Sequence, residues 1–87
     1  MWHTYIIECE DGSLYTGITD DLKHRLEMHR TRRGAEYTKS NFPMHILYSE
    51  RYKTKFEAAK REHQTKGWTR AKKLALAKGD LTLLKSL

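Results

Sequence analysis

The stretch "TYIIECEDGSLYTGIT", Thr4–Thr19, decides the fold of this 87-residue chain. β-branched and aromatic residues alternate on both sides of Asp11-Gly12, and an Asp-Gly pair between two such segments is a strong hairpin signal. We therefore expect antiparallel strands over 2–9 and 13–19, joined by a loop of three or four residues. The hairpin carries two phenols at matched places, Tyr5 and Tyr15.

The rest of the chain predicts helices and one more strand. Helices are expected over 19–30, 54–66, 68–79 and 80–87, and a third strand over 44–52. Thr19 or Asp20 caps the first helix, Thr54 and Glu57 form a capping box on the second, and Gly79 ends the third. We predict one domain over 1–87 of the α+β class, with a three-stranded antiparallel sheet flanked by helices.

Charge is spread unevenly along the chain. The net charge of +6 divides into −4 over residues 1–29 and +10 over residues 30–87. Such asymmetry favours a polyanionic partner, and nucleic acid is the leading candidate, although a solvated helical surface would give the same count. The basic residues expected to contact nucleic acid are Arg30, Arg32, Arg33, Lys60, Arg61, Lys66, Arg70, Lys72 and Lys73.

The composition argues against several other classes of protein. No apolar run reaches the roughly 20 residues of a membrane span, and the N-terminus lacks the pattern of a signal peptide. Cys9 is the only cysteine, which fits a reducing compartment, and we expect a cytoplasmic protein without a structural zinc site. Trp68 is expected to anchor a helix, with base stacking as the alternative.

Several residues that suit phosphodiester chemistry fall on the elements that would pack together. The hairpin brings the phenols, the first helix brings Arg25 and His29 one turn apart, and the second helix brings Glu62. A guanidinium forks onto phosphate oxygens, and a carboxylate can hold Mg²⁺. Each residue also has a plain explanation, such as strand packing, a local ion pair, a helix end, or an i,i+4 bridge from Glu62 to Lys66.

Taken in order, these segments resemble the GIY-YIG endonucleases, in particular their small stand-alone bacterial members. "HTY" at 3–5 and "YTG" at 15–17 are similar to the two halves of the motif. "TDDLKHRLEMHR" at 19–30 resembles the first helix of the family, and "EAAKREHQTKGW" at 57–68 resembles the helix that carries the metal-binding glutamate. The similarity extends over "AEYTKSNFPMHILYSE" at 35–50 and so covers nearly the whole chain.

The resemblance implies a role for each matching residue. Tyr15 would be the general base or orient the nucleophilic water, and Tyr5 would help to organise the nucleophile and the phosphate. Arg25 would stabilise negative charge in the transition state, and His29 would assist proton transfer or hold the tyrosine. Glu62 would bind one divalent cation, Mg²⁺ or Mn²⁺.

Gly17 would permit a close approach of the backbone, and three neighbouring positions depart from the family pattern. His3 replaces the first glycine of the motif, Thr16 replaces its middle isoleucine, and Ile18 stands where some members have a lysine. The expected function is metal-dependent hydrolysis of DNA by an endonuclease. The alternatives are a catalytically weak or inactive nucleic-acid-binding accessory module of the same fold, and a protein-interaction domain.

Overall fold

The computed structural model describes residues 1–31 and 43–86 and confirms the α+β class. Its three strands are β1 (Trp2–Cys9), β2 (Leu14–Thr19) and β3 (Pro43–Tyr52). They form one sheet in the order β2-β1-β3, and both pairings are antiparallel. The hairpin strand β1 is therefore central, and β2 and β3 are the two edges.

The register of the hairpin places both phenols on one face of the sheet. Tyr5 lies opposite Gly17, and Ile7 lies opposite Tyr15. Directly opposed residues in an antiparallel pair project from the same face, and alternate residues share a face. The side chains of Tyr5, Ile7 and Tyr15 therefore lie on one side, and Thr4 and its alternating neighbours lie on the other.

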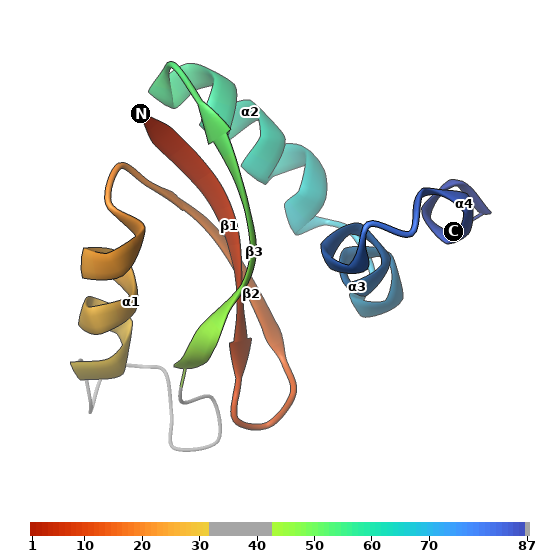
Figure 1. Cartoon of the computed structure of the whole chain (residues 1–87), viewed down its shortest axis with the longest axis horizontal. Helices are drawn as coiled ribbons and strands as arrows, with labels where there is room; N and C mark the ends of the chain where they lie inside the picture. Colours follow the sequence, from red (N-terminus) through yellow and green to blue (C-terminus); the bar gives the residue numbers. More distant parts are fainter. Residues whose placement is uncertain (32–42, 87) are drawn as a thin grey trace.

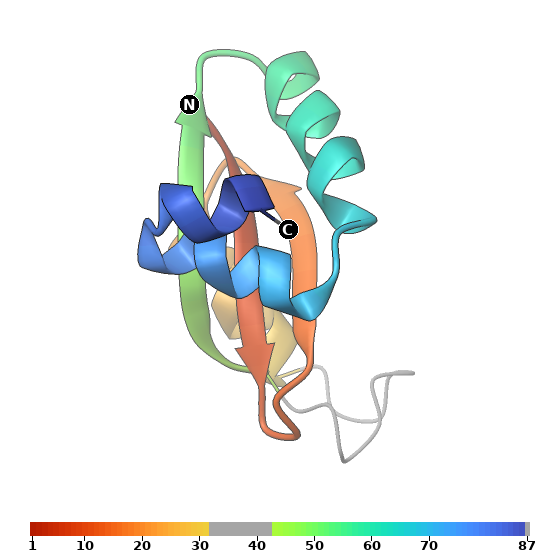
Figure 2. The ribbon, with the colours of Figure 1, turned by 90° about the vertical axis from the view of Figure 1, so that its right-hand side faces the viewer.

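The described residues also form four helices, α1 (Leu22–Thr31), α2 (Lys55–Lys66), α3 (Arg70–Lys78) and α4 (Leu81–Ser86), which lie on the two sides of this sheet. Figure 1 shows the sheet edge-on, with α1 on one side and the three later helices on the other. Figure 2 shows that α3 runs across the direction of the strands, and Figure 1 shows that α4 lies beyond α3, farther from the sheet. Among the described residues, no helix has the length and apolarity to cross a membrane.

The face beneath α1 holds the core of the hairpin. Burial raises the pKa of the Cys9 thiol, with smaller effects from its neighbours, so that Cys9 packs there as a small apolar residue. Asp21 starts α1 by accepting a hydrogen bond from the His24 N–H at 3.1 Å, where Thr19 or Asp20 was predicted as the cap. The residues packed together on this face are Tyr5, Ile7, Cys9, Tyr15, Leu22, Leu26 and Ile46.

On the opposite face, α2 lies close to the sheet. The predicted capping box of Thr54 and Glu57 is present. Ala58 is fully buried, and its carbonyl oxygen accepts a hydrogen bond of 2.8 Å from the Thr4 hydroxyl on β1. Alanine presents no bulk beyond Cβ, so this position lets the helix backbone come within hydrogen-bond distance of a strand side chain. The contact places α2 over the central strand.

The turn between α2 and α3 is fixed by aromatic and polar contacts. The Trp68 ring has the Arg61 guanidinium 5.3 Å and the Lys72 ammonium 4.4 Å from its centroid, as expected of a helix-anchoring aromatic. Thr69 caps α3 by accepting from the Lys72 N–H, so α3 begins two residues later than predicted. Gly79, at φ +74°, ends α3 as expected.

Candidate functional site

The two phenols and the glycine of the hairpin form one cluster on the α1 face. The rings of Tyr5 and Tyr15 are tilted against each other, with centroids 6.4 Å apart. A Cβ at Gly17 would stand 2.6 Å from the Tyr5 hydroxyl oxygen and 2.8 Å from its Cζ. The Tyr5 ring therefore lies directly over Gly17, which brings its hydroxyl above β2. The close approach expected at Gly17 is present, and the partner is the tyrosine.

The phenols differ in their access to solvent. Tyr5 is only 2 % exposed, whereas Tyr15 is half-buried. A substrate phosphate arriving at this face would meet Tyr15, while Tyr5 would act through the groups that it packs against. The register thus separates a phenol at the surface from one beneath it.

Arg25 lies on α1, the helix that covers this cluster. Leu22 and Leu26, on either side of it in sequence, pack against the core, which leaves Arg25 half-buried at the margin. Within the described part of the chain its guanidinium has no hydrogen bond or ion pair, so the local acid that could have neutralised it is not seen. His29 belongs to α1, but its side chain lies outside what the structure describes.

Glu62 lies on α2, and the rotation of that helix shows which way it faces. Arg61 points to β3, because its guanidinium binds the Glu50 carboxylate with N–O distances of 2.9 and 3.1 Å. Ala58 faces the central strand, and Glu62 follows about 40° past it on the side away from Arg61, at roughly 100° per residue. The Glu62 side chain is therefore directed toward β2.

The Glu62 carboxylate is available for a ligand. It is half-buried and makes no hydrogen bond or ion pair with any residue that the structure describes. The i,i+4 bridge to Lys66, which the sequence allows, is not among the contacts of this region. A carboxylate held near the sheet without a partner can accept a cation or a donor from a substrate.

The candidate residues thus lie on both faces of the sheet. Tyr5, Tyr15 and Arg25 belong to the α1 face, and Glu62 belongs to the α2 face. Tyr15 lies on β2 and Glu62 is directed toward it from the other face, and β2 is an edge of the sheet that the described residues form. A ligand that contacts both Tyr15 and Glu62 would have to lie against this edge, which is the candidate site.

The donor set at this edge fits a single hard cation. No group of three or more His, Cys, Asp or Glu side chains is gathered within residues 1–28 and the described parts of 43–86. Mg²⁺ keeps several waters and is commonly bound by one or two carboxylates together with substrate phosphates. Glu62 alone satisfies that requirement, whereas a site built entirely of protein ligands would not fit.

The predicted nucleic-acid contacts are only partly placed on an accessible surface. Arg61 is engaged with Glu50, and Lys73 is only 7 % exposed, so neither belongs to an exposed basic face. Burial, with a smaller contribution from Lys66, lowers the pKa of Lys73. Lys60, Lys66, Arg70 and Lys72 remain at least partly exposed; the side chain of Arg30 and residues Arg32 and Arg33 lie outside the described part.

A polar network between α2 and the edge strand β3 was not expected from the sequence. Tyr48 and Tyr52 each donate a hydrogen bond to the Glu50 carboxylate, at 2.7 and 2.6 Å, and Arg61 binds both of its oxygens. An open groove of about 420 Å³ lies between β3 and α2, and its lining residues are Glu50, Tyr52, Glu57, Lys60, Arg61 and Gln64. The period-two spacing of Tyr48, Glu50 and Tyr52 on a strand was the available signal.

The network shifts the pKa values of its members. Burial alone would raise the pKa of Glu50, but the hydrogen bonds from Arg61, Tyr52 and Tyr48 outweigh it and hold that pKa below its ordinary value. Burial and the bonds to Glu50 raise the pKa values of both Tyr48 and Tyr52 to about 12. Glu50 is thus fully satisfied and is a structural group.

Comparison with known proteins shows the family to which the chain belongs. Residues 1–75 match the model of the GIY-YIG catalytic domain. UPF0213 proteins of Staphylococcus aureus, from strains Mu3 and Mu50 among others, are 53 % identical over 74 residues, which cover 85 % of this chain and 90 % of theirs. The solution NMR structure of a UPF0213 protein from Bacillus halodurans is 37 % identical, with a TM-score of 0.55 over 90 % of this chain and 84 % of that one. The chain belongs to the GIY-YIG family.

Proposed function

We propose that this protein hydrolyses phosphodiester bonds in DNA with the help of one divalent cation. The observation that carries the proposal is that Arg25 on the α1 face and Glu62 on the α2 face are both half-buried and make no hydrogen bond or ion pair with any described residue. Tyr15 lies on β2, the strand toward which Glu62 is directed. The chain belongs to a family of nuclease domains and has a net charge of +6, and both facts support a nucleic acid as the substrate.

Glu62 would hold the cation, which would neutralise phosphate charge and polarise the reacting phosphoryl group. Arg25 would bind the phosphate oxygens through its planar fork and stabilise the charge that develops on them. These two groups approach from opposite faces of the sheet, so the phosphate would be held across the edge of β2. Such positioning is itself a large part of the catalytic effect.

Tyr15 would orient the attacking water or remove its proton, because it is the more exposed of the two phenols. Tyr5, buried over Gly17, would position Tyr15. His29 follows Arg25 by one turn of α1 and would assist the proton transfer. In this assignment Tyr5 is a positioning residue.

The first test measures cleavage of labelled DNA and RNA of several structures in Mg²⁺, Mn²⁺ or EDTA. The parent should cleave at least one DNA only with a divalent ion present. Glu62→Gln should abolish this cleavage with little change in stability, and Tyr15→Phe should slow it by on the order of 10²-fold or more without weakening binding. Raising the pH should not rescue Tyr15→Phe, which has no proton to lose.

Glu57→Gln is a matched control, since it removes a carboxylate from the same helix while a glutamine can maintain the capping box. Its cleavage rate should equal that of the parent. A Glu62→Gln variant as active as the parent would refute the metal assignment. Cleavage of RNA alone would refute DNA as the substrate.

A second candidate function is a nucleic-acid-binding accessory module. The burial of Tyr5 at 2 % exposure favours it, because a phenol so enclosed also serves simply as core. This alternative expects binding without divalent-dependent cleavage on every structure tested, and a silent Tyr15→Phe. The same panel of substrates therefore separates the two functions.

A further inference from the structure

The outward face of α2 carries an exposed aromatic side chain. Phe56 is 75 % exposed, and among the described residues only Met1 is another large hydrophobic side chain left so open. Phe56 stands in the first turn of a helix whose backbone is fixed by the capping box and by the Ala58 contact to β1. A large apolar ring on so well-anchored a helix is not explained by packing against the described residues.

Helix geometry aligns Phe56 with cationic groups. Ala58 and Thr65 are buried toward the sheet, and Phe56, Lys60 and His63 fall within an arc of about 60° on the opposite side. All three are exposed. The outward stripe of α2, defined as Phe56, Lys60 and His63, is therefore aromatic at one end and basic beyond it.

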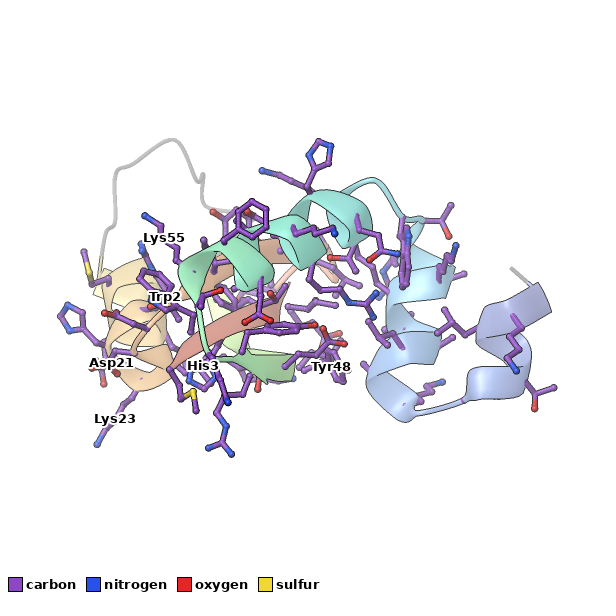
Figure 3. The ribbon with its side chains drawn as sticks, turned by 90° about the horizontal axis from the view of Figure 1, so that it is seen from above. Trp2, His3, Asp21, Lys23, Tyr48 and Lys55 are labelled. Carbon is purple, nitrogen blue, oxygen red and sulfur yellow. The ribbon has the colours of Figure 1, made fainter. Side chains whose placement is uncertain are left out.

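The surroundings of Phe56 strengthen the positive character of this end of α2. Lys53 and Lys55 are exposed just before it, and the Lys55 ammonium lies 5.3 Å from the centroid of the Trp2 ring on β1. Both side chains are labelled in Figure 3. Glu57 is the acidic residue of this turn, and its carboxylate accepts hydrogen bonds from the Thr54 N–H and hydroxyl. An aromatic ring among lysines suits an aromatic polyanion better than an apolar protein surface.

We propose that Phe56 stacks on an unpaired base, so that the substrate carries a single-stranded segment beside the bond that is cut. Bases within a duplex are already stacked on one another, and only unpaired bases can lie on an exposed side chain. Lys60, one turn along the stripe, contacts the adjoining phosphate. The inference rests on the proposed nuclease function for the position of the scissile bond.

The positions of Phe56 and Glu62 on α2 define the path of such a strand. Glu62 follows Phe56 by six positions, which is about 9 Å along the helix axis and about 120° around it. A strand that reaches both residues therefore runs along α2 and around its side, from the outward stripe to the side that faces β2. A phosphate at Glu62 and a base on Phe56 then belong to one strand, a few nucleotides apart.

The test measures binding in EDTA, so that it does not depend on turnover. Fluorescence anisotropy compares a labelled single-stranded DNA with a blunt duplex of the same sequence. Phe56→Ala should weaken binding of the single strand by on the order of tenfold and leave the duplex within about twofold. Phe56→Trp should restore the affinity, and Phe56→Leu, which keeps an apolar side chain without a π face, should not.

Lys60→Gln serves as the matched control for charge. It should weaken both DNAs and make the salt dependence shallower, whereas Phe56→Ala should leave the salt dependence unchanged. Unchanged single-strand affinity in Phe56→Ala, an equal loss on both DNAs, or full rescue by Phe56→Leu would each overturn the stacking. Stacking without any divalent-dependent cleavage by the parent would instead overturn the proposed nuclease function and leave Phe56 as a binding residue.

Discussion

At the scale of a residue, two buried threonines differ in whether their hydroxyl groups form a hydrogen bond. Thr16 on β2 and Thr65 on α2 are both 2 % exposed. The Thr65 hydroxyl donates to the Arg61 carbonyl oxygen at 2.9 Å, whereas the Thr16 hydroxyl has no partner among the described residues. Thr16 also stands where the family motif has an isoleucine, so an apolar side chain belongs in this position.

Thr16→Val should therefore stabilise the protein. The substitution removes a buried hydroxyl that lacks a partner and keeps the shape of the side chain, so the free energy of unfolding should rise by about 1 kcal/mol. Urea denaturation followed by circular dichroism measures it. Thr65→Val is the matched control. It removes a hydroxyl that forms a hydrogen bond, so it should not raise the free energy of unfolding. A destabilised Thr16→Val would mean that this hydroxyl has a partner.

At the scale of elements, the Glu50 network fastens α2 to the edge strand β3. Glu50 on the strand receives Arg61 from the helix and the hydroxyls of Tyr48 and Tyr52 from the same strand. This attachment sets the rotation of α2, and the same rotation directs Glu62 toward β2. A structural ion pair at one edge of the sheet thus positions the candidate metal ligand near the other.

Loss of that network should appear as a pH-dependent loss of stability. The folded-state pKa of Glu50 lies below its ordinary value of 4.5, so its contribution is present above about pH 4.5 and is lost as the pH falls through the folded-state value. Glu50→Gln should lower the free energy of unfolding by about 1–3 kcal/mol at pH 7. The difference from the parent, measured by urea denaturation between pH 7 and pH 3, should shrink at the acidic end. A difference that is constant over this range would show that ionisation of Glu50 contributes nothing.

At the scale of the whole molecule, the uneven charge predicts how binding depends on salt. Lys60 and Lys66 on α2 are exposed, so each can neutralise a phosphate and release a counterion. On duplex DNA the log–log slope of affinity against salt should be about −0.9 for each phosphate neutralised, and the double variant Lys60→Gln/Lys66→Gln should be shallower by about one to two. Titrations between 50 and about 200 mM salt measure the slope.

Lys73→Met is the control. Because Lys73 is buried, this substitution should leave the slope unchanged. Affinity that does not vary with salt in the parent would contradict a phosphate-binding role for this surface. If Lys73→Met changed the slope as much as the double variant does, Lys73 would have to belong to the exposed basic surface.

The sequence by itself determined the hairpin, the order of the elements and the family. The Asp11-Gly12 turn, the capping box at Thr54 and the glycine at Gly79 act locally, so short-range patterns were enough to predict them. The family resemblance named Tyr5, Tyr15, Gly17, Arg25, His29 and Glu62 together, because a motif preserves residue type and spacing.

Only the tertiary structure decided how these residues are placed relative to one another. Alternation along a strand gives the face of a side chain, but the packing of α1 and α2 on opposite faces places Tyr15 and Glu62 on two sides of β2. The register puts the Tyr5 ring over Gly17, a contact between residues twelve apart that no local pattern specifies. Burial of Lys73 and the pairing of Arg61 with Glu50 depend equally on contacts distant in sequence, which is why charge counting could not foresee them.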